Sequence, residues 1–284
     1  MTDLRQSSDY ARYLKACNWQ VADGSGAYAF IRRIPFTPIS IIKVQRPAKI
    51  SFTAISRLTK KHRAFFVYLE PAANAQATAA QSHGFRLSKS PFLPTKTIHL
   101  DLSPPLAKIL AQMKKDGRYC LRKAQLQTLQ LTKVTNLTAF RAVWPRRWLG
   151  WKPSLKNLHR LKKSFGKNAL FLAATSPHHQ IIAGTVILIA NKTAYYYYAF
   201  TTKQGRQKLA QYWLVWQAIK ESKKRGCQIF DFEGIYDPRF SSKSWLGFSH
   251  FKHSFGGTEI TYPGCFVKSR LRKVIGICTT RRVG

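Results

Sequence analysis

The sequence predicts an α/β protein in which mixed sheets are flanked by helices, arranged as two similar units that meet near residue 127. Segments with period-2 alternation and segments with helical periodicity follow one another along the chain. The order of elements before residue 127 also starts again after it, without a literal repeat. A chain of 284 residues with 45% hydrophobic content can form two ordinary cores. We expect units at 1–127 and 128–284, and the C-terminal tail could pack back on the first unit.

The first half alternates helices with strands that are bounded by proline and glycine turns. The expected helices are 4–16, 50–63 and 72–82, and the expected strands are 27–34, 39–44, 64–69, 85–87 and 97–102. Ser103 followed by Pro104 has the form of an N-cap with proline in the first turn. One amphipathic helix is therefore expected from this point through the basic segment RYCLRKAQ.

The second half repeats this order. The expected strands are 129–134, 170–175, 182–190, 194–200 and 228–233, and the expected helices are 138–148, 154–165 and 207–224. Two long strands followed by a helix and another strand suggest an N-acyltransferase core of the GNAT type. Coenzyme-A-dependent members carry a glycine-rich turn that lets a pyrophosphate reach helix N-terminal amides. The corresponding segment, TTKQGRQKLAQ, has one glycine among long side chains, so we expect no coenzyme A and no other cofactor.

The strand 228–233 carries an unusual concentration of acid. The chain has 11 Asp and Glu residues, and four of them lie between Glu221 and Asp237. Period-2 geometry predicts that Asp231 and Glu233 share one face. Such a pair could share proton transfer or orient a substrate. It could equally form structural ion pairs with Arg or Lys.

The charge balance indicates a polyanionic partner. The formal net charge is +37, and residues 117–220 contain no acid against 18 Lys and Arg. Nucleic acid, a nucleotide-linked substrate or an anionic lipid surface would each fit, and a lineage with basic proteins is the plain alternative. Five scattered cysteines without a CxxC pair argue against a zinc site and for a reducing cytoplasm. Since the longest apolar run, 181–190, is too short for a span, any membrane contact would be peripheral, for example through the basic tail.

Three segments resemble the signatures of the FemABX peptidyltransferases. The C-terminal one is YYYYAFTTKQGRQKLAQYWLVWQAIKESKKRGCQIFDFEGI followed by WLGFSHFKHSFGG. The central one is TKTIHLDLSPPLAKILAQMKKDGRYCLRKAQ, and LRQSSDYARYLKACNW is a weaker N-terminal echo. The resemblance implies two GNAT-like units, the first binding the acceptor. It also implies transfer of an amino acid from aminoacyl-tRNA to the stem peptide of a UDP-linked or lipid-linked peptidoglycan precursor.

The resemblance further implies a cytoplasmic enzyme, and we expect a monomer. The alternatives are an N-acyltransferase with another acyl donor or an exopolysaccharide-related acceptor, and a basic nucleic-acid-binding protein on a silent scaffold. The chain departs from the family in two respects. It has no charged coiled-coil insertion, and Tyr10 stands where a tryptophan is usual.

The resemblance also carries residue roles. Lys252, in the FK pair of HFKHSFGG, matches a lysine placed near the reacting carbonyl, where a fixed positive charge would stabilise an oxyanion. Asp101 matches an acidic position that could orient or deprotonate the amine, although it could also only favour the following helix. Arg147, with Arg146 as the alternative register, and Trp151 could grip a diphosphate and stack on a sugar or base. Gln6, Tyr10 and Lys15 are candidates for the nucleotide end of the acceptor.

The run 195–198 consists of four tyrosines. Alternation predicts two rings in the core and two toward the cleft, and Tyr197 and Tyr198 are the substrate-binding candidates. Four histidines lie at 178, 179, 250 and 253 without a third ligand in spacing, so none is expected to bind a metal.

Overall fold

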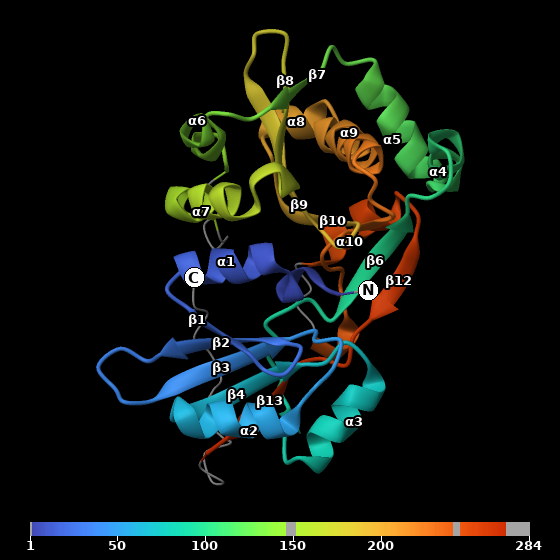
Figure 1. The fold of residues 1–284 in the computed structure, drawn as a ribbon. Helices are drawn as coiled ribbons and strands as arrows, with labels where there is room; N and C mark the ends of the chain where they lie inside the picture. The colour runs from blue at the N-terminus through green and yellow to red at the C-terminus, as the bar shows by residue number, and fades with distance from the viewer. Residues whose placement is uncertain (1, 146–151, 241–244, 271–284) are drawn as a thin grey trace. The chain divides into compact units, whose positions relative to one another are not determined.

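The structure is a computed structural model that describes residues 2–145, 152–240 and 245–270. The chain divides into two compact units, Met1–Thr95 with Tyr262–Gly284, and Lys96–Thr261. Each unit has its own mixed sheet (Figure 1).

The sheet of the first unit has the order β1-β2-β3-β4-β13-β5. Its strands are β1 (Gln20–Asp23), β2 (Tyr28–Arg33), β3 (Ser40–Gln45), β4 (Ala64–Glu70), β5 (Arg86–Leu87) and β13 (Phe266–Ser269). Its helices are η1 (Leu4–Gln6), α1 (Ser8–Ala16), α2 (Phe52–Lys61) and α3 (Asn74–Ser82). Strands β3 and β4 are parallel, and the other pairs are antiparallel. Alternate apolar residues of β2, β3 and β4 form one buried core with α2 and α3.

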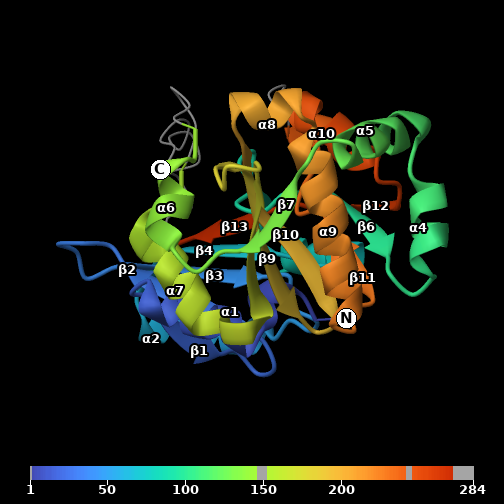
Figure 2. The same cartoon turned by 90° about the horizontal axis from the view of Figure 1, so that it is seen from above.

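The sheet of the second unit has the order β12-β6-β11-β10-β9-β8-β7. Its strands are β6 (Lys96–Asp101), β7 (Gln130–Lys133), β8 (Ala169–Thr175), β9 (Ile181–Ala190), β10 (Thr193–Thr201), β11 (Ile229–Asp231) and β12 (Thr258–Thr261). Its helices are α4 (Leu106–Gln112), α5 (Lys115–Gln125), α6 (Leu137–Ala142), α7 (Leu155–Phe165), η2 (Gly166–Asn168), α8 (Lys203–Gln207), α9 (Ala210–Lys224), η3 (Pro238–Phe240) and α10 (Leu246–His253). Helix α9 packs against β8, β9 and β10, and Figure 2 shows α6 and α7 on the other side of these strands.

The division of the chain differs from the expected boundary near residue 127. Strand β6 pairs with β11 and β12, so the segment from Lys96 onward belongs to the second sheet. Strand β13 pairs with β4 and β5, which places it in the first sheet. Both pairings join strands far apart in sequence, and hydrophobic periodicity does not reveal such partners.

The single helix expected after Ser103 is instead two helices. The N-cap of α4 is Pro105 rather than Ser103. Met113 and Lys114 have extended backbone conformations between α4 and α5. The backbone N–H of Lys114 donates to the carbonyl of Ser254 at 3.0 Å. A Cβ atom on Gly117 would lie 2.4 Å from the same carbonyl oxygen. The close approach of the chain after α10 therefore breaks the helix and requires glycine at 117.

The helix expected at 207–224 begins later, as α9 at Ala210, and the short helix α8 precedes it. Leu209 between them has a left-handed conformation, with φ of 52°. Thr202 caps α8 by accepting the N–H of Gly205 at 3.0 Å. Strands β1, β12 and β13 and helix α10 were absent from the expected elements. Each is short, at four to eight residues, and short elements carry weak periodicity.

Candidate functional site

The site is built where β11 ends. Parallel pairing with β10 and antiparallel pairing with β6 hold β11 only as far as Asp231. Glu233 and Gly234 then have positive φ angles of 55° and 111°, so the backbone leaves the strand at these two residues. Phe232 N–H still donates to the Ile98 carbonyl of β6 at 3.0 Å, and after the turn Ile235 N–H donates to the Lys96 carbonyl at 2.8 Å. The prediction that Glu233 continues the Asp231 face by strand alternation is therefore wrong.

Lys252 lies on α10 with its ammonium turned inward. The residue is 8% exposed, and its Nζ donates to the carbonyl oxygen of Gly234 at 2.6 Å. Nζ also lies 5.0 Å from the ring centre of Phe248 and 5.8 Å from that of Tyr196, within the range of cation–π attraction. Burial lowers the pKa of Lys252 to about 8, and the charges of Glu233 and Asp231 oppose this shift.

Asp231 is a buried carboxylate held by several donors. Its exposure is 1%, and its Oδ1 accepts the Thr97 hydroxyl at 2.6 Å and the Glu233 N–H at 2.8 Å. The imidazole Nε2 of His99 lies 3.1 Å from Oδ2. Thr97 also accepts the N–H of Gly234 at 3.1 Å. Asp231 thus fixes the turn whose carbonyl receives Lys252.

Asp101 lies further along β6, opposite Ile229. Its side chain is exposed and accepts the backbone N–H and the hydroxyl of Ser103, each at 2.8 Å. The Ser103 N–H, followed by its hydroxyl, lowers the pKa of Asp101. The contacts of this carboxylate are those of a local turn at the strand end, and they weaken it as a base.

The tyrosine run does not alternate, because a β-bulge interrupts the pairing of β9 and β10 between Tyr196 and Tyr198. Tyr195 and Tyr196 are consequently both buried, and Tyr197 and Tyr198 are both half-buried. The Tyr198 ring stacks edge-on against Trp144 at 6.1 Å. The hydroxyl of Tyr196 accepts Gln211 Nε2 at 2.6 Å, and burial raises the pKa of Tyr196.

The three N-terminal candidates occupy different environments in the first unit. The Gln6 amide accepts the Tyr28 N–H at 2.7 Å and donates to the Gln45 carbonyl at 2.8 Å, so it ties η1 to β2 and β3. Tyr10 is buried on α1 against Phe30. Lys15 is exposed at the end of the same helix. Arg146, Arg147 and Trp151 lie outside the described residues.

The turn before α9 is filled by the protein's own chain. A Cβ atom on Gly205 would lie 2.2 Å from the carbonyl oxygen of Ile182 and 2.6 Å from the Thr201 hydroxyl. This glycine therefore permits close packing of α8 on β9.

Within the described ranges, no group of three His, Cys, Asp or Glu side chains could hold a metal ion. His250 pairs with Asp116 and His253 with Glu259, at 3.1 and 3.3 Å.

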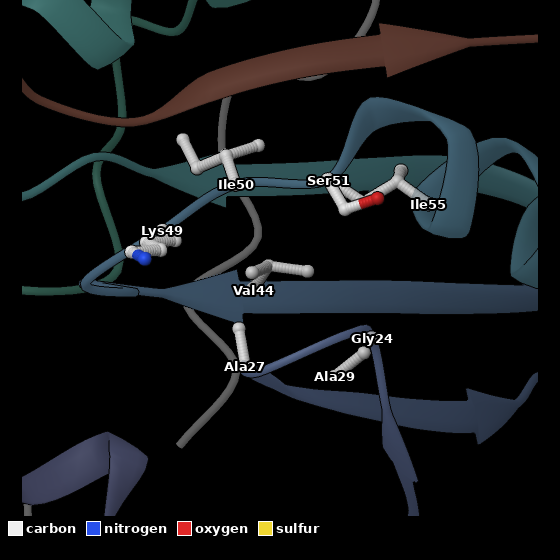
Figure 3. A pocket seen from close by; sticks show the side chains of 8 residues that line it. All are labelled: Gly24, Ala27, Ala29, Val44, Lys49, Ile50, Ser51 and Ile55. Atoms are coloured by element: carbon white, nitrogen blue, oxygen red, sulfur yellow. The ribbon is translucent and has the colours of Figure 1, made fainter.

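A small cavity in the first unit lies among Gly24, Ala27, Val44, Ile50 and Ile55, with Lys49 and Ser51 at its edge (Figure 3). Ser51 is the N-cap of α2 and accepts the Ala54 N–H. The lining is otherwise apolar and contains none of the candidate residues.

Among the described helices, none has the length and apolar character needed to cross a membrane.

The fold belongs to the GNAT-like class. A tandem GNAT protein from the clavulanic acid biosynthesis pathway superposes with a TM-score of 0.50 at 10% identity, over 86% of this chain and 78% of that one. The structure of FemX superposes with a TM-score of 0.79 at 13% identity, over 93% and 92% of the two chains. The C-terminal domain of a putative lysylphosphatidylglycerol synthetase from Agrobacterium fabrum gives 0.62 at 13% identity, over 92% and 87%. The expected fold class is confirmed.

The sequence of the C-terminal part matches one family model. Residues 153–273 match the model of the FemAB family, and this segment contains Asp231, Glu233 and Lys252. The match confirms the resemblance to the FemABX proteins over this segment. No curated protein sequence matches the chain.

Two residues of the site, Thr97 and His99, were not identified from the sequence. Their signal was present in TKTIHLDL, where Thr97, His99 and Asp101 alternate with Ile98, Leu100 and Leu102. The apolar set is buried, so the polar set lies on the opposite face of β6. Alternation does not show that this face meets Asp231, which lies 132 residues after His99 in the chain.

Proposed function

We propose that this protein is an aminoacyltransferase that moves an amino acid from aminoacyl-tRNA to the stem peptide of a peptidoglycan precursor. One observation carries the proposal: a buried ammonium, that of Lys252, is held at the end of β11 within the segment that matches the FemAB family. A buried lysine is costly and needs a reason.

The reaction supplies that reason. An amine that attacks an aminoacyl ester gives a tetrahedral intermediate with a negative oxygen, and a fixed cation in a low-dielectric site stabilises it. An ammonium has three hydrogens, and Gly234 accepts one of them. Lys252 is therefore already oriented by the protein before a substrate oxygen arrives. Asp231 and Glu233 keep the ammonium charged by opposing the effect of burial.

The substrates follow from charge and from the turn before α9. Transfer RNA and a UDP-linked or lipid-linked muropeptide are both polyanions, which suits a chain of net charge +37. Coenzyme A suits it less, because Gly205 packs on β9 instead of leaving room for a pyrophosphate. We propose a cytoplasmic monomer that works without a cofactor and reaches lipid-linked acceptors, if it uses them, by peripheral contact with the membrane.

The test is transfer in a purified system. Protein, charged tRNA and a UDP-linked muropeptide should give a product that is one amino acid heavier by mass spectrometry. Lys252→Met should lower turnover at least about 100-fold, in line with removal of one oxyanion donor, while tRNA binding persists. Equal turnover by the variant would refute the role of Lys252. Tight binding of acetyl-coenzyme A in a calorimeter would move the protein to another acyl donor.

A lipid acceptor is the second candidate. The fold matches the C-terminal domain of a putative lysylphosphatidylglycerol synthetase over 92% of this chain. Phosphatidylglycerol vesicles, given in place of the muropeptide, distinguish the two acceptors in one assay. An exopolysaccharide-related amine can be tested in the same way. If the wild type binds tRNA and transfers to none of these acceptors, the chain is a nucleic-acid-binding protein on a silent scaffold.

A further inference from the structure

The proposed reaction needs a proton acceptor, and two of the acidic candidates from the sequence, Asp231 and Asp101, are already engaged by other groups. Attack by the amine releases a proton that must reach the leaving oxygen. The Asp231 carboxylate is buried and accepts three donors. Asp101 binds its own Ser103 and has a lowered pKa, which makes it a weak base. Lys252 as an ammonium has no lone pair to offer.

His99 has a geometry that Asp231, Asp101 and Lys252 lack. It lies in the middle of β6, opposite Asp231 on β11 and opposite Thr258 on β12. Its Nε2 lies 3.1 Å from Asp231 Oδ2, and its side chain is 26% exposed. One edge of the imidazole thus faces a buried carboxylate, and part of the ring is accessible from outside.

The hydrogen-bond network determines which nitrogen carries the hydrogen. The N–H of Gly234 donates to the Thr97 hydroxyl, and this hydroxyl then donates its own hydrogen to Asp231. An ionised carboxylate only accepts, so the imidazole nitrogen that faces Asp231 must be the donor. In neutral His99, Nε2 therefore carries the hydrogen and Nδ1 presents a lone pair. A carboxylate in this position also stabilises the imidazolium that forms when Nδ1 takes a proton.

The same network leads to Lys252. Lys252 Nζ donates to the Gly234 carbonyl at 2.6 Å, and the Gly234 N–H donates to Thr97 at 3.1 Å. Thr97 donates to Asp231 at 2.6 Å, and His99 donates to Asp231 at 3.1 Å. An ammonium and an imidazole are therefore fixed relative to each other by four consecutive hydrogen bonds. They are the two groups that aminolysis of an ester requires, a charge for the oxyanion and an acceptor for the proton.

We infer that His99 is the general base of the proposed aminoacyl transfer and that Asp231 and Thr97 are its positioning residues. The amine nitrogen forms the C–N bond to the ester carbonyl carbon, and Nδ1 takes one N–H proton. The C–O bond to the ribose then breaks, and the proton passes from Nδ1 to the departing ribose oxygen. The products are the amide and tRNA with a free hydroxyl. This inference rests on the proposed function.

The chain contains a matched control. His253 Nε2 also lies 3.3 Å from a carboxylate oxygen, that of Glu259, and 29% of the His253 side chain is exposed. The acid beside His253 is thus Glu259 on β12, whereas the acid beside His99 is Asp231 on β11. Against wild type, His99→Ala should lower turnover about 100-fold to 10,000-fold, the usual contribution of a general base. Added imidazole should restore part of the turnover of His99→Ala. His253→Ala should retain turnover within about threefold and should not respond to imidazole.

Two results would overturn the inference separately from the proposed function. If wild type transfers the amino acid and His99→Ala transfers it equally well, or loses it without rescue by imidazole, His99 is not the base. Independently of activity, nitrogen NMR of ¹⁵N-histidine-labelled protein should show His99 in the Nε2–H tautomer, and Asp231→Asn should disturb that signal. An Nδ1–H tautomer would refute the assignment. Absence of any transfer by wild type would refute the proposed function, and this inference with it.

Discussion

Burial of the Lys252 ammonium makes the stability of the protein depend on alkaline pH. Its pKa is about 8 in the folded protein and near its ordinary 10.5 in the unfolded chain. Below pH 8 both states are protonated and the folded state carries the whole penalty of burial. Between pH 8 and 10.5 the unfolded chain binds more protons, so the free energy of unfolding rises with pH.

The magnitude follows from the two pKa values. The two pKa values correspond to about 3 kcal/mol in total, and linkage places about 2–3 kcal/mol of it between pH 7 and pH 10. Lys252→Met removes the titrating amine while keeping an unbranched side chain. The free energy of unfolding of wild type minus that of Lys252→Met should therefore shift by about 2–3 kcal/mol in favour of wild type over this range.

Urea unfolding at pH 7, 8, 9 and 10 measures this difference. Tyrosine and cysteine titration affects both proteins and cancels in the subtraction, and the exposed residue change Lys108→Met is the matched control. Loss of the bond to Gly234 adds an offset that does not vary with pH. Parallel curves for wild type and Lys252→Met would show that the ammonium is not buried, and the reasoning about the site would fail.

Three further predictions concern single contacts. Thr97→Val should destabilise the protein by about 1–3 kcal/mol in urea unfolding, because it leaves the Asp231 carboxylate and the Gly234 N–H without their shared hydroxyl; Thr97→Ser should recover most of the loss, and equal stability of Thr97→Val would contradict the network. Gly205→Ala should lower the melting temperature by several degrees, because the new Cβ would lie 2.2 Å from the Ile182 carbonyl oxygen. Gly247→Ala should leave the melting temperature unchanged, because a Cβ atom there has no neighbouring atom within 4 Å. Asp101→Asn should change turnover less than about tenfold, since its carboxylate is engaged by Ser103. Because its pKa is lowered on folding, wild type should lose stability relative to Asp101→Asn as the pH falls through the folded pKa.

Local patterns predicted the fold wherever an element is long and regular. Strands β8, β9 and β10 and helix α7 are within two residues of their expected bounds, because each is amphipathic or wholly apolar over seven or more residues. The failures share a tertiary cause. The hydrogen bond to Ser254 separates α4 from α5, and a bulge after Tyr196 interrupts the alternation of the tyrosine side chains. Strand β11 ends two residues earlier than expected because the chain turns at Glu233 and Gly234.

The candidate site was only partly predictable for a related reason. Lys252 came from a motif and its role stays a prediction; the structure adds that the residue is buried and that its Nζ donates to the Gly234 carbonyl. Strand alternation predicted Glu233 beside Asp231, yet the two side chains that contact Asp231, those of Thr97 and His99, come from β6, more than 130 residues earlier. Long-range strand pairing is set by the whole sheet, and no local pattern in TKTIHLDL names its partner.

The most direct test of the central claim is transfer by the purified chain. With charged tRNA and a UDP-linked or lipid-linked muropeptide, wild type should add one aminoacyl residue to the peptide, and Lys252→Met should bind tRNA yet form product at least about 100-fold more slowly. Product formation at the same rate by both proteins, or none by wild type with either acceptor, would contradict the account.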